Sequence, residues 1–254
     1  MSGVKTTLDP QAFLARLRNA ASPRGFREEI FACIDGLALP AFVRESGAPG
    51  KPRTYLSAGI HGDEPAGPEA MLALLESGEF DERADWWLVP LINPTGFVQG
   101  TRENAAGVDL NRDFKDCRTA EVAGLVEWLR RQPDFTASWC LHEDWEALGF
   151  YLYELNPENR PTLAPAMLAA AERLLPIEQA ATIDGRPAAE PGIIRPVNDP
   201  LERVDWPEAI YLRAHHTALS YTLETPSMLP LADRVAAQVA AVRAGLAELL
   251  PTAR

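Results

Sequence analysis

Short apolar runs of strand length alternate along this chain with segments of helical period. The clearest strand-like runs are Arg53–Gly59, Trp86–Ile92, Phe135–Leu141 and Leu219–Leu223. Strands separated by helical segments favour a largely parallel sheet that is covered by helices. We therefore expect an α/β fold for residues 1–254, as a single domain with a mixed, mostly parallel twisted sheet and helices on both faces.

Local signals place further elements around this sheet. Asp9 before Pro10 is typical of a helix start, and the apolar period of Leu231–Leu250 predicts a closing amphipathic helix. Phe31–Leu37 and Ala41–Arg44 read as short strands that form a hairpin at the sheet edge. The stretch from Asn93 to about Cys117 has no convincing period, and the Pro/Gly-rich segment 176–207 predicts a second long loop.

Charge and cysteine content exclude several classes of partner. The chain has 24 Lys and Arg against 36 Asp and Glu, a net charge of −12 that repels phosphate backbones and anionic headgroups. Nucleic-acid and membrane partners are therefore not expected. No basic segment followed by an apolar core opens the chain, so we expect a cytoplasmic protein. Three widely spaced cysteines without a CxxC arrangement indicate neither a disulfide framework nor a thiolate zinc cluster.

Three polar residues follow predicted strands directly: His61, His142 and Glu224. The carboxyl ends of parallel strands line a common crevice, so these residues could meet there. His61 and Glu64 are three residues apart and could bind one ion if Gly62 permits a tight turn, with His142 as third ligand. Hydrolytic zinc sites commonly take three protein ligands and keep one position open. Taken alone, His61 is more simply explained as a turn cap and His142 as a buried core histidine, but together with Glu224 and the loop after Asn93 they favour a metal site.

The loop after Asn93 carries candidate groups for binding a substrate. Arg112 can bind a carboxylate through two parallel hydrogen bonds, and Asn111 adds a neutral donor. Arg102 could polarise a scissile carbonyl and hold the oxyanion. For any single arginine, a salt bridge to one of the abundant carboxylates is the simpler explanation.

Together these motifs resemble the zinc metallocarboxypeptidase family that includes carboxypeptidase A. The resemblance rests on motifs that occur in the family's order: His61-x-x-Glu64, Asn93-Pro-Thr-Gly, Arg102 followed nine residues later by Asn111-Arg112, Leu141-His142 and Leu223-Glu224-Thr225. It runs from about Tyr55 to Glu224. The first fifty residues and the stretch from Leu155 to Asp205 match no motif of the family.

By this resemblance, His61, Glu64 and His142 bind one Zn²⁺ ion, and Glu224 is the general base. Zinc lowers the pKa of its bound water, and Glu224 would take the water proton and pass it to the leaving amine. A second metal is conceivable at His142-Glu143-Asp144 and His215-His216, but adjacent side chains rarely aim at one point. One zinc ion remains the main expectation.

The resemblance also implies how a substrate is held. Asn111 and Arg112 would bind its terminal carboxylate, and Arg102 would stabilise the oxyanion. A tyrosine from the loop before the catalytic Glu is assigned to Tyr211, for which Tyr151 or Tyr153 could be mistaken.

Three functions remain open at this point. The stretch from Asn104 to Arg112 is similar to small murein-peptide amidases, so we rank hydrolysis of a peptide or amino-acid amide beside a free carboxylate first. Deacylation of N-acyl amino acids, as in aspartoacylase and succinylglutamate desuccinylase, ranks second, because those proteins usually add a β domain and this chain ends soon after Glu224. A non-catalytic peptide-binding member ranks third. The acidic residues Glu202, Asp205 and Glu208 could favour a basic substrate side chain.

Overall fold

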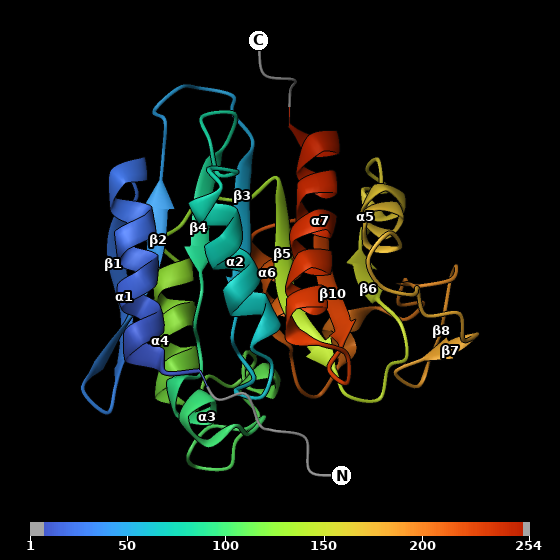
Figure 1. Cartoon of the computed structure of the whole chain (residues 1–254), viewed down its shortest axis with the longest axis horizontal. Coiled ribbons are helices and arrows are strands. Elements are labelled where there is room, and N and C mark those ends of the chain that lie inside the picture. Colours follow the sequence, from blue (N-terminus) through green and yellow to red (C-terminus); the bar gives the residue numbers. More distant parts are fainter. Residues whose placement is uncertain (1–7, 251–254) are drawn as a thin grey trace.

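The computed structural model describes residues 8–250 and is built around an eight-stranded mixed sheet (Figure 1). Its strands are β1 (Arg27–Ile34), β2 (Leu37–Arg44), β3 (Arg53–Ala58), β4 (Asp85–Val89), β5 (Ala137–Asp144), β6 (Tyr151–Leu155), β9 (Ile193–Ile194) and β10 (Ser220–Pro226). Their spatial order is β1-β2-β4-β3-β5-β10-β6-β9. The four central strands β4, β3, β5 and β10 are parallel to one another, which confirms the predicted α/β class.

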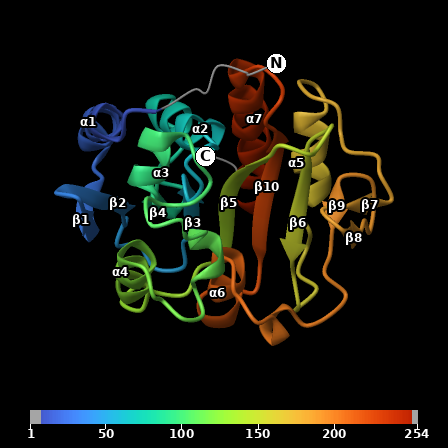
Figure 2. The same ribbon diagram turned by 90° about the horizontal axis from the view of Figure 1, so that it is seen from below.

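Helices cover both faces of this sheet. They are α1 (Pro10–Ala21), α2 (Ala66–Glu76), α3 (Pro94–Gln99), α4 (Ala120–Leu129), α5 (Ala164–Ala171), α6 (Glu208–His215) and α7 (Leu231–Leu249). Helices α1, α2, α7 and α5 lie along one face, and α4 and α6 lie along the other (Figure 2). A small separate hairpin of β7 (Thr182–Ile183) and β8 (Arg186–Pro187) stands beyond β9.

The central strands owe their continuous apolar runs to this layering. β3 is buried at every position after Arg53, and β4 is buried from Trp86 to Val89. Parallel strands covered by helices on both faces have no solvent side, so they lack an alternating pattern. At the sheet edge, β1 and β2 pair antiparallel, which confirms the predicted hairpin.

Two expectations about the extent of regular structure were wrong. His142 and Glu224 do not follow their strands but lie within β5 and β10, because backbone pairing continues for two more residues, to Asp144 and Pro226. The stretch after Asn93 is not without regular structure: it contains α3 and a 3-10 turn at Leu110–Arg112. Asn93 caps α3 by accepting a hydrogen bond from the Gly96 N–H. A six-residue helix is too short to show a period in the sequence.

Within residues 8–250, no helix is long and apolar enough to cross a bilayer. The first seven residues, which contribute to the N-terminal interpretation, lie outside the described residues, as do the last four. The predicted start of α1 is confirmed, because the Asp9 side chain accepts hydrogen bonds from Gln11 N and Ala12 N.

We expect Asp9→Ala to lower the free energy of unfolding by about 1 kcal/mol, because two N–H groups of the first turn lose their acceptor. Asp9→Asn keeps a capping oxygen and should stay within about 0.3 kcal/mol of the parent. Urea unfolding followed by circular dichroism measures both. An equal loss in the two variants would show that the cap is not the source of the effect.

Candidate active site

The turn after β3 presents His61 and Glu64 at the carboxyl edge of the sheet. Gly59 has a positive φ of 70°, and its carbonyl accepts hydrogen bonds from Ile92 N and Asn93 N. Gly62 lies directly against α3, where an added Cβ would be 1.9 Å from the carbonyl carbon of Gly96. Gly62 is therefore required by this close approach of two backbones, which ties the His61 turn to α3.

His61, Glu64 and His142 come together as a buried cluster. Glu64 Oε1 lies 2.5 Å from His61 Nδ1, and Glu64 Oε2 lies 3.0 Å from His142 Nδ1. One donor atom of each residue lies within 4.8 Å of the others. Among residues 8–250, this is the only group of three or more His, Cys, Asp or Glu side chains placed to share one ion. Two imidazoles and a carboxylate form a donor set that suits zinc.

The electrostatics of this cluster follow from burial and from its mutual contacts. Burial alone raises the pKa of Glu64, but the two adjacent histidines outweigh it and lower that pKa. Burial lowers the pKa of His61, whereas Glu64 and Asp109 raise it, with a net increase. Asp109 Oδ1 lies 3.2 Å from His61 Nε2, on the ring edge away from Glu64. A carboxylate at that nitrogen orients the imidazole.

Arg102 reaches this cluster from the loop after α3. Its Nη1 lies 3.4 Å from Glu64 Oε1, and its Nε donates to Asp109 Oδ2 at 3.0 Å. The guanidinium is about a third exposed, so part of it faces the cavity. It is thus fixed beside the metal-binding candidates, with donor capacity left for a ligand.

Glu224 stands beside His142, since the two are register partners on β10 and β5. No described residue forms a hydrogen bond with its carboxylate within the structured range 8–250. Burial raises the pKa of Glu224 well above its usual value, with Glu64 and Asp144 adding to the increase and His142 opposing it. A carboxylate in such surroundings is a strengthened proton acceptor.

Asn111 and Arg112 line the same cavity. The Asn111 side-chain oxygen accepts a hydrogen bond from Glu208 N at the start of α6, at 2.9 Å. This contact turns the amide so that its NH₂ group, a donor, remains available. Arg112 Nη1 donates to the Asn111 carbonyl at 2.8 Å, and its Nε lies 3.4 Å from Asp205 Oδ2.

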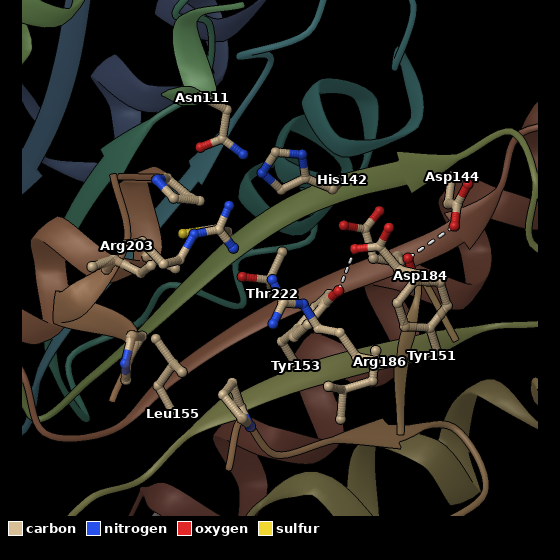
Figure 3. A pocket seen from close by; sticks show the side chains of 18 of the residues that line it. Asn111, His142, Asp144, Tyr151, Tyr153, Leu155, Asp184, Arg186, Arg203 and Thr222 are labelled. Atoms are coloured by element: carbon tan, nitrogen blue, oxygen red, sulfur yellow. Dashed lines mark hydrogen bonds between the residues drawn. The ribbon is translucent and has the colours of Figure 1, made fainter. Parts of the chain in front are cut away.

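All the predicted site residues except Tyr211 line one cavity of about 800 Å³ (Figure 3). Tyr211 lies in α6, and its ring packs on His215 and Phe114 with centroid distances of 4.6 and 6.0 Å. Tyr211 is therefore a buried packing residue in this structure. Tyr151 and Tyr153 of β6 are the tyrosines that face the cavity.

Sequence reasoning missed several residues of this cavity. Asp109 lies within the stretch from Asn104 to Arg112 but was given no role, although its spacing from Asn111 and Arg112 was a usable signal. Asp184, Arg186 and Arg203 also line the cavity. They come from the segment that matches no motif, and only the tertiary fold brings them to the site.

The chain has a metallocarboxypeptidase-like hydrolase fold with a candidate His/Glu/His metal site, and the comparisons agree. The family model of the succinylglutamate desuccinylase/aspartoacylase catalytic domain matches residues 50–176, half of the chain. The chain belongs to this family. In the ranking of candidate functions from the sequence, the reaction of this family stood second. The broader resemblance to the zinc metallocarboxypeptidase family is confirmed.

Solved structures and sequence relatives of this chain are also metallopeptidase-like or carboxypeptidases. A structure from Shewanella amazonensis SB2B with a provisional metallopeptidase assignment is 27% identical, with a TM-score of 0.83 over 96% of this chain and 94% of that chain. A metallo-carboxypeptidase from Pseudomonas aeruginosa, 19% identical, shares the fold with a TM-score of 0.70 over 96% of this chain and 69% of its own. Carboxypeptidase SOL1 of Arabidopsis thaliana is 36% identical over 104 residues, 33% of this chain. That match spans only 21% of the relative's length.

We expect His142→Ala to lose most of the zinc that the parent protein retains, falling below about a tenth, because one of the three candidate ligands is removed. His215→Ala is the matched control, since His215 is exposed and outside the cavity. Zinc per chain after dialysis is measured by atomic emission. Equal zinc contents in the two variants would remove His142 from the metal centre.

Proposed function

We propose that this protein is a zinc-dependent hydrolase that cleaves an amide or peptide bond next to a free carboxylate. The observation that carries the proposal is the buried cluster of His61, Glu64 and His142, which opens into the cavity that Arg102 and Arg112 line. Ligands for a metal, a base and donors for anions thus share one enclosed space. An active site is identified by such a complete set of roles.

His61, Glu64 and His142 would hold the zinc ion. Zinc bound there would lower the pKa of a water molecule and polarise the scissile carbonyl. Asp109 orients the His61 ring from its far nitrogen, 3.2 Å away. The buried contacts of Glu64 with both imidazoles keep the three donors in place.

Glu224 would act as general base and then as general acid. Its carboxylate lies beside His142 and is free of hydrogen bonds from the described residues. It can take a proton from the attacking water and deliver it to the leaving amine. Its raised pKa makes it better suited to take up that proton near neutral pH.

Asn111 and Arg112 would hold the substrate's free carboxylate. The Asn111 amide is oriented by Glu208 N, which leaves its NH₂ group to donate. Arg112 is about two-fifths exposed, and within residues 8–250 its one ion pair joins its Nε to Asp205 Oδ2 at 3.4 Å. Arg102 would stabilise negative charge on the carbonyl oxygen.

The family match favours a second candidate, which is deacylation of an N-acyl amino acid. Its chemistry needs the same residues, because the bond cleaved is again an amide next to a carboxylate. The two candidates differ in the group on the far side of that bond. A peptide would leave that side extended, whereas an acyl group would be compact.

A hydrolysis screen of the zinc-loaded protein distinguishes the two candidates. One pool would contain dipeptides and tripeptides, γ-D-glutamyl-diaminopimelate peptides and N-acyl amino acids, with products identified by mass spectrometry. Release of an amino acid from a peptide supports the carboxypeptidase or amidase reaction. Cleavage of the N-acyl compounds alone supports the deacylase. No cleavage in any class, with zinc bound, contradicts the proposed hydrolase and favours the non-catalytic alternative.

We expect Glu224→Gln to lower kcat by about 10²- to 10⁴-fold on the substrate found, because the amide cannot accept the water proton. Zinc content should stay at the parent level, since Glu224 is not among the proposed ligands. Glu248→Gln, an exposed position on α7, is the control for the loss of one carboxylate. Turnover of Glu224→Gln at the parent rate would exclude Glu224 from the mechanism.

A further inference from the structure

Helix α2 begins two residues after Glu64 and takes its cap from a different element. Its N-cap position is Pro65, which makes no side-chain hydrogen bond to the first turn. Instead, Glu143 Oε1 on β5 accepts a hydrogen bond from Ala66 N at 2.7 Å. A carboxylate is well suited to this place, because it satisfies a free N–H group and faces the positive end of the helix dipole. Glu143 therefore caps α2 from the neighbouring strand.

This cap connects two of the metal-binding candidates by a short path. Glu143 directly follows His142, and Ala66 is the second residue after Glu64. The main chain of Glu143 makes a further link, because its N–H donates to Glu64 Oε2 at 3.1 Å. Both the side chain and the main chain of Glu143 thus hold the segment that carries Glu64.

Helix α2 also lies very close to β5 at this point. A Cβ added to Gly67 would be 2.9 Å from the carbonyl oxygen of Leu141. The first turn of the helix is therefore in direct contact with the strand that carries His142. Such packing limits how closely the two elements approach, whereas a hydrogen bond is directional and also fixes their relative shift.

Arg234 of α7 holds the second oxygen of the Glu143 carboxylate. Its Nη1 donates to Glu143 Oε2, and its Nε donates to the Leu229 carbonyl at 2.8 Å. The two charged side chains are only 8% and 0% exposed. Apolar replacement of a buried ion pair is often neutral or stabilising, so stability alone does not account for this pair. Its specific effect is to orient the carboxylate that caps α2.

Gln238, one turn further along α7, fixes β5 independently of Glu143. Its Nε2 donates to the His142 carbonyl at 2.8 Å and to Thr225 Oγ1 on β10 at 3.1 Å. The backbone at His142 is thus held from α7 and from the paired strand. Loss of the Glu143 cap would therefore displace the Glu64 turn rather than His142.

We infer that Glu143 is a positioning residue of the metal centre. By capping α2 it holds Glu64 where this carboxylate and His142 can share one ion, and Arg234 orients it for that task. The inference rests on the proposed function, because it takes His61, Glu64 and His142 as the ligands. Residues that orient metal ligands typically change metal affinity by about 10- to 100-fold when they are replaced.

Two double variants isolate the hydrogen bond to Ala66 from the charge of Glu143. Glu143→Met with Arg234→Met removes both buried charges and the acceptor for Ala66 N. Glu143→Gln with Arg234→Met removes the same charges but keeps a side-chain oxygen for that N–H. We expect the zinc Kd to rise about 10- to 100-fold in the first variant. In the second it should stay within about threefold of the parent value. Competition with a chromophoric chelator measures both.

Glu154→Met with Arg195→Met is the matched control. Glu154 on β6 is a buried strand carboxylate that pairs with Arg195 at 2.6 Å, and it lies outside the metal-binding cluster. Its removal should leave the zinc Kd at the parent value. Visible absorption of the Co²⁺-loaded proteins gives a second readout, because these bands depend on ligand geometry. We expect changed bands in Glu143→Met with Arg234→Met and parent-like bands in the control.

The inference is overturned if Glu143→Met with Arg234→Met binds zinc as the parent does, or if the control pair weakens zinc equally. It is also overturned if the glutamine in Glu143→Gln with Arg234→Met fails to restore affinity. Should the methionine variant not fold by circular dichroism, Glu143→Gln alone decides. Arg234 would then attract the single amide oxygen, the NH₂ group would face Ala66 N, and the zinc Kd should again rise. An unchanged Kd there would contradict the positioning role.

Zinc affinity needs no turnover, so this inference and the proposed function can fail separately. Tight zinc binding without hydrolysis of any substrate class contradicts the hydrolase, and the series of Kd values still decides the role of Glu143. Hydrolysis by the parent with equal Kd values across the series contradicts the positioning role and leaves the hydrolase intact. A parent protein that binds no zinc overturns both.

Discussion

The site depends on one buried carboxylate that is shared by two histidines. Glu64 lies between His61 and His142 and also accepts a hydrogen bond from Glu143 N at 3.1 Å. An isolated charge at this depth would cost several kcal/mol or would be neutralised. The two imidazoles make its ionised form the favoured one, as the lowered pKa of Glu64 shows. Since His61 and Glu64 follow β3 and His142 lies within β5, the pairing of these strands is a condition for the cluster.

The sequence predicted the buried central strands, because burial gives them recognisable apolar runs. β3, β4 and β5 appear as continuous apolar runs because helices cover them on both sides. It did not predict where β5 and β10 end, since backbone pairing in a parallel ladder proceeds regardless of polar side chains such as His142 and Glu224. Helix α3 escaped notice because six residues give too few apolar positions for a period. Tyr211 was assigned to the site because it lies in the expected interval of the sequence, but its ring packs into the core.

The residues of the site differ in how far local sequence determines them. His61 and Glu64 lie on one turn, and Gly62 could be expected there, although the reason is the approach of Gly96 rather than a positive φ. Asn111 and Arg112 are adjacent in sequence, yet the orientation of the Asn111 amide comes from Glu208, which lies 97 positions away. Such contacts are tertiary, and no local pattern encodes them.

The residues that line the cavity therefore come from two kinds of segment, the central strands and the surface segments beside them. The metal-binding candidates and Glu224 lie on or directly after the central strands, where a shift of one residue would disturb the core. Arg186 belongs to a two-stranded hairpin outside the main sheet. Tyr153 OH donates a hydrogen bond to Asp184 of this hairpin, which joins the hairpin to β6 at the cavity. Surface segments positioned by a rigid scaffold tolerate replacement and commonly determine binding. The part of the cavity wall that the hairpin forms can therefore change without disturbing the strands that carry the metal-binding candidates.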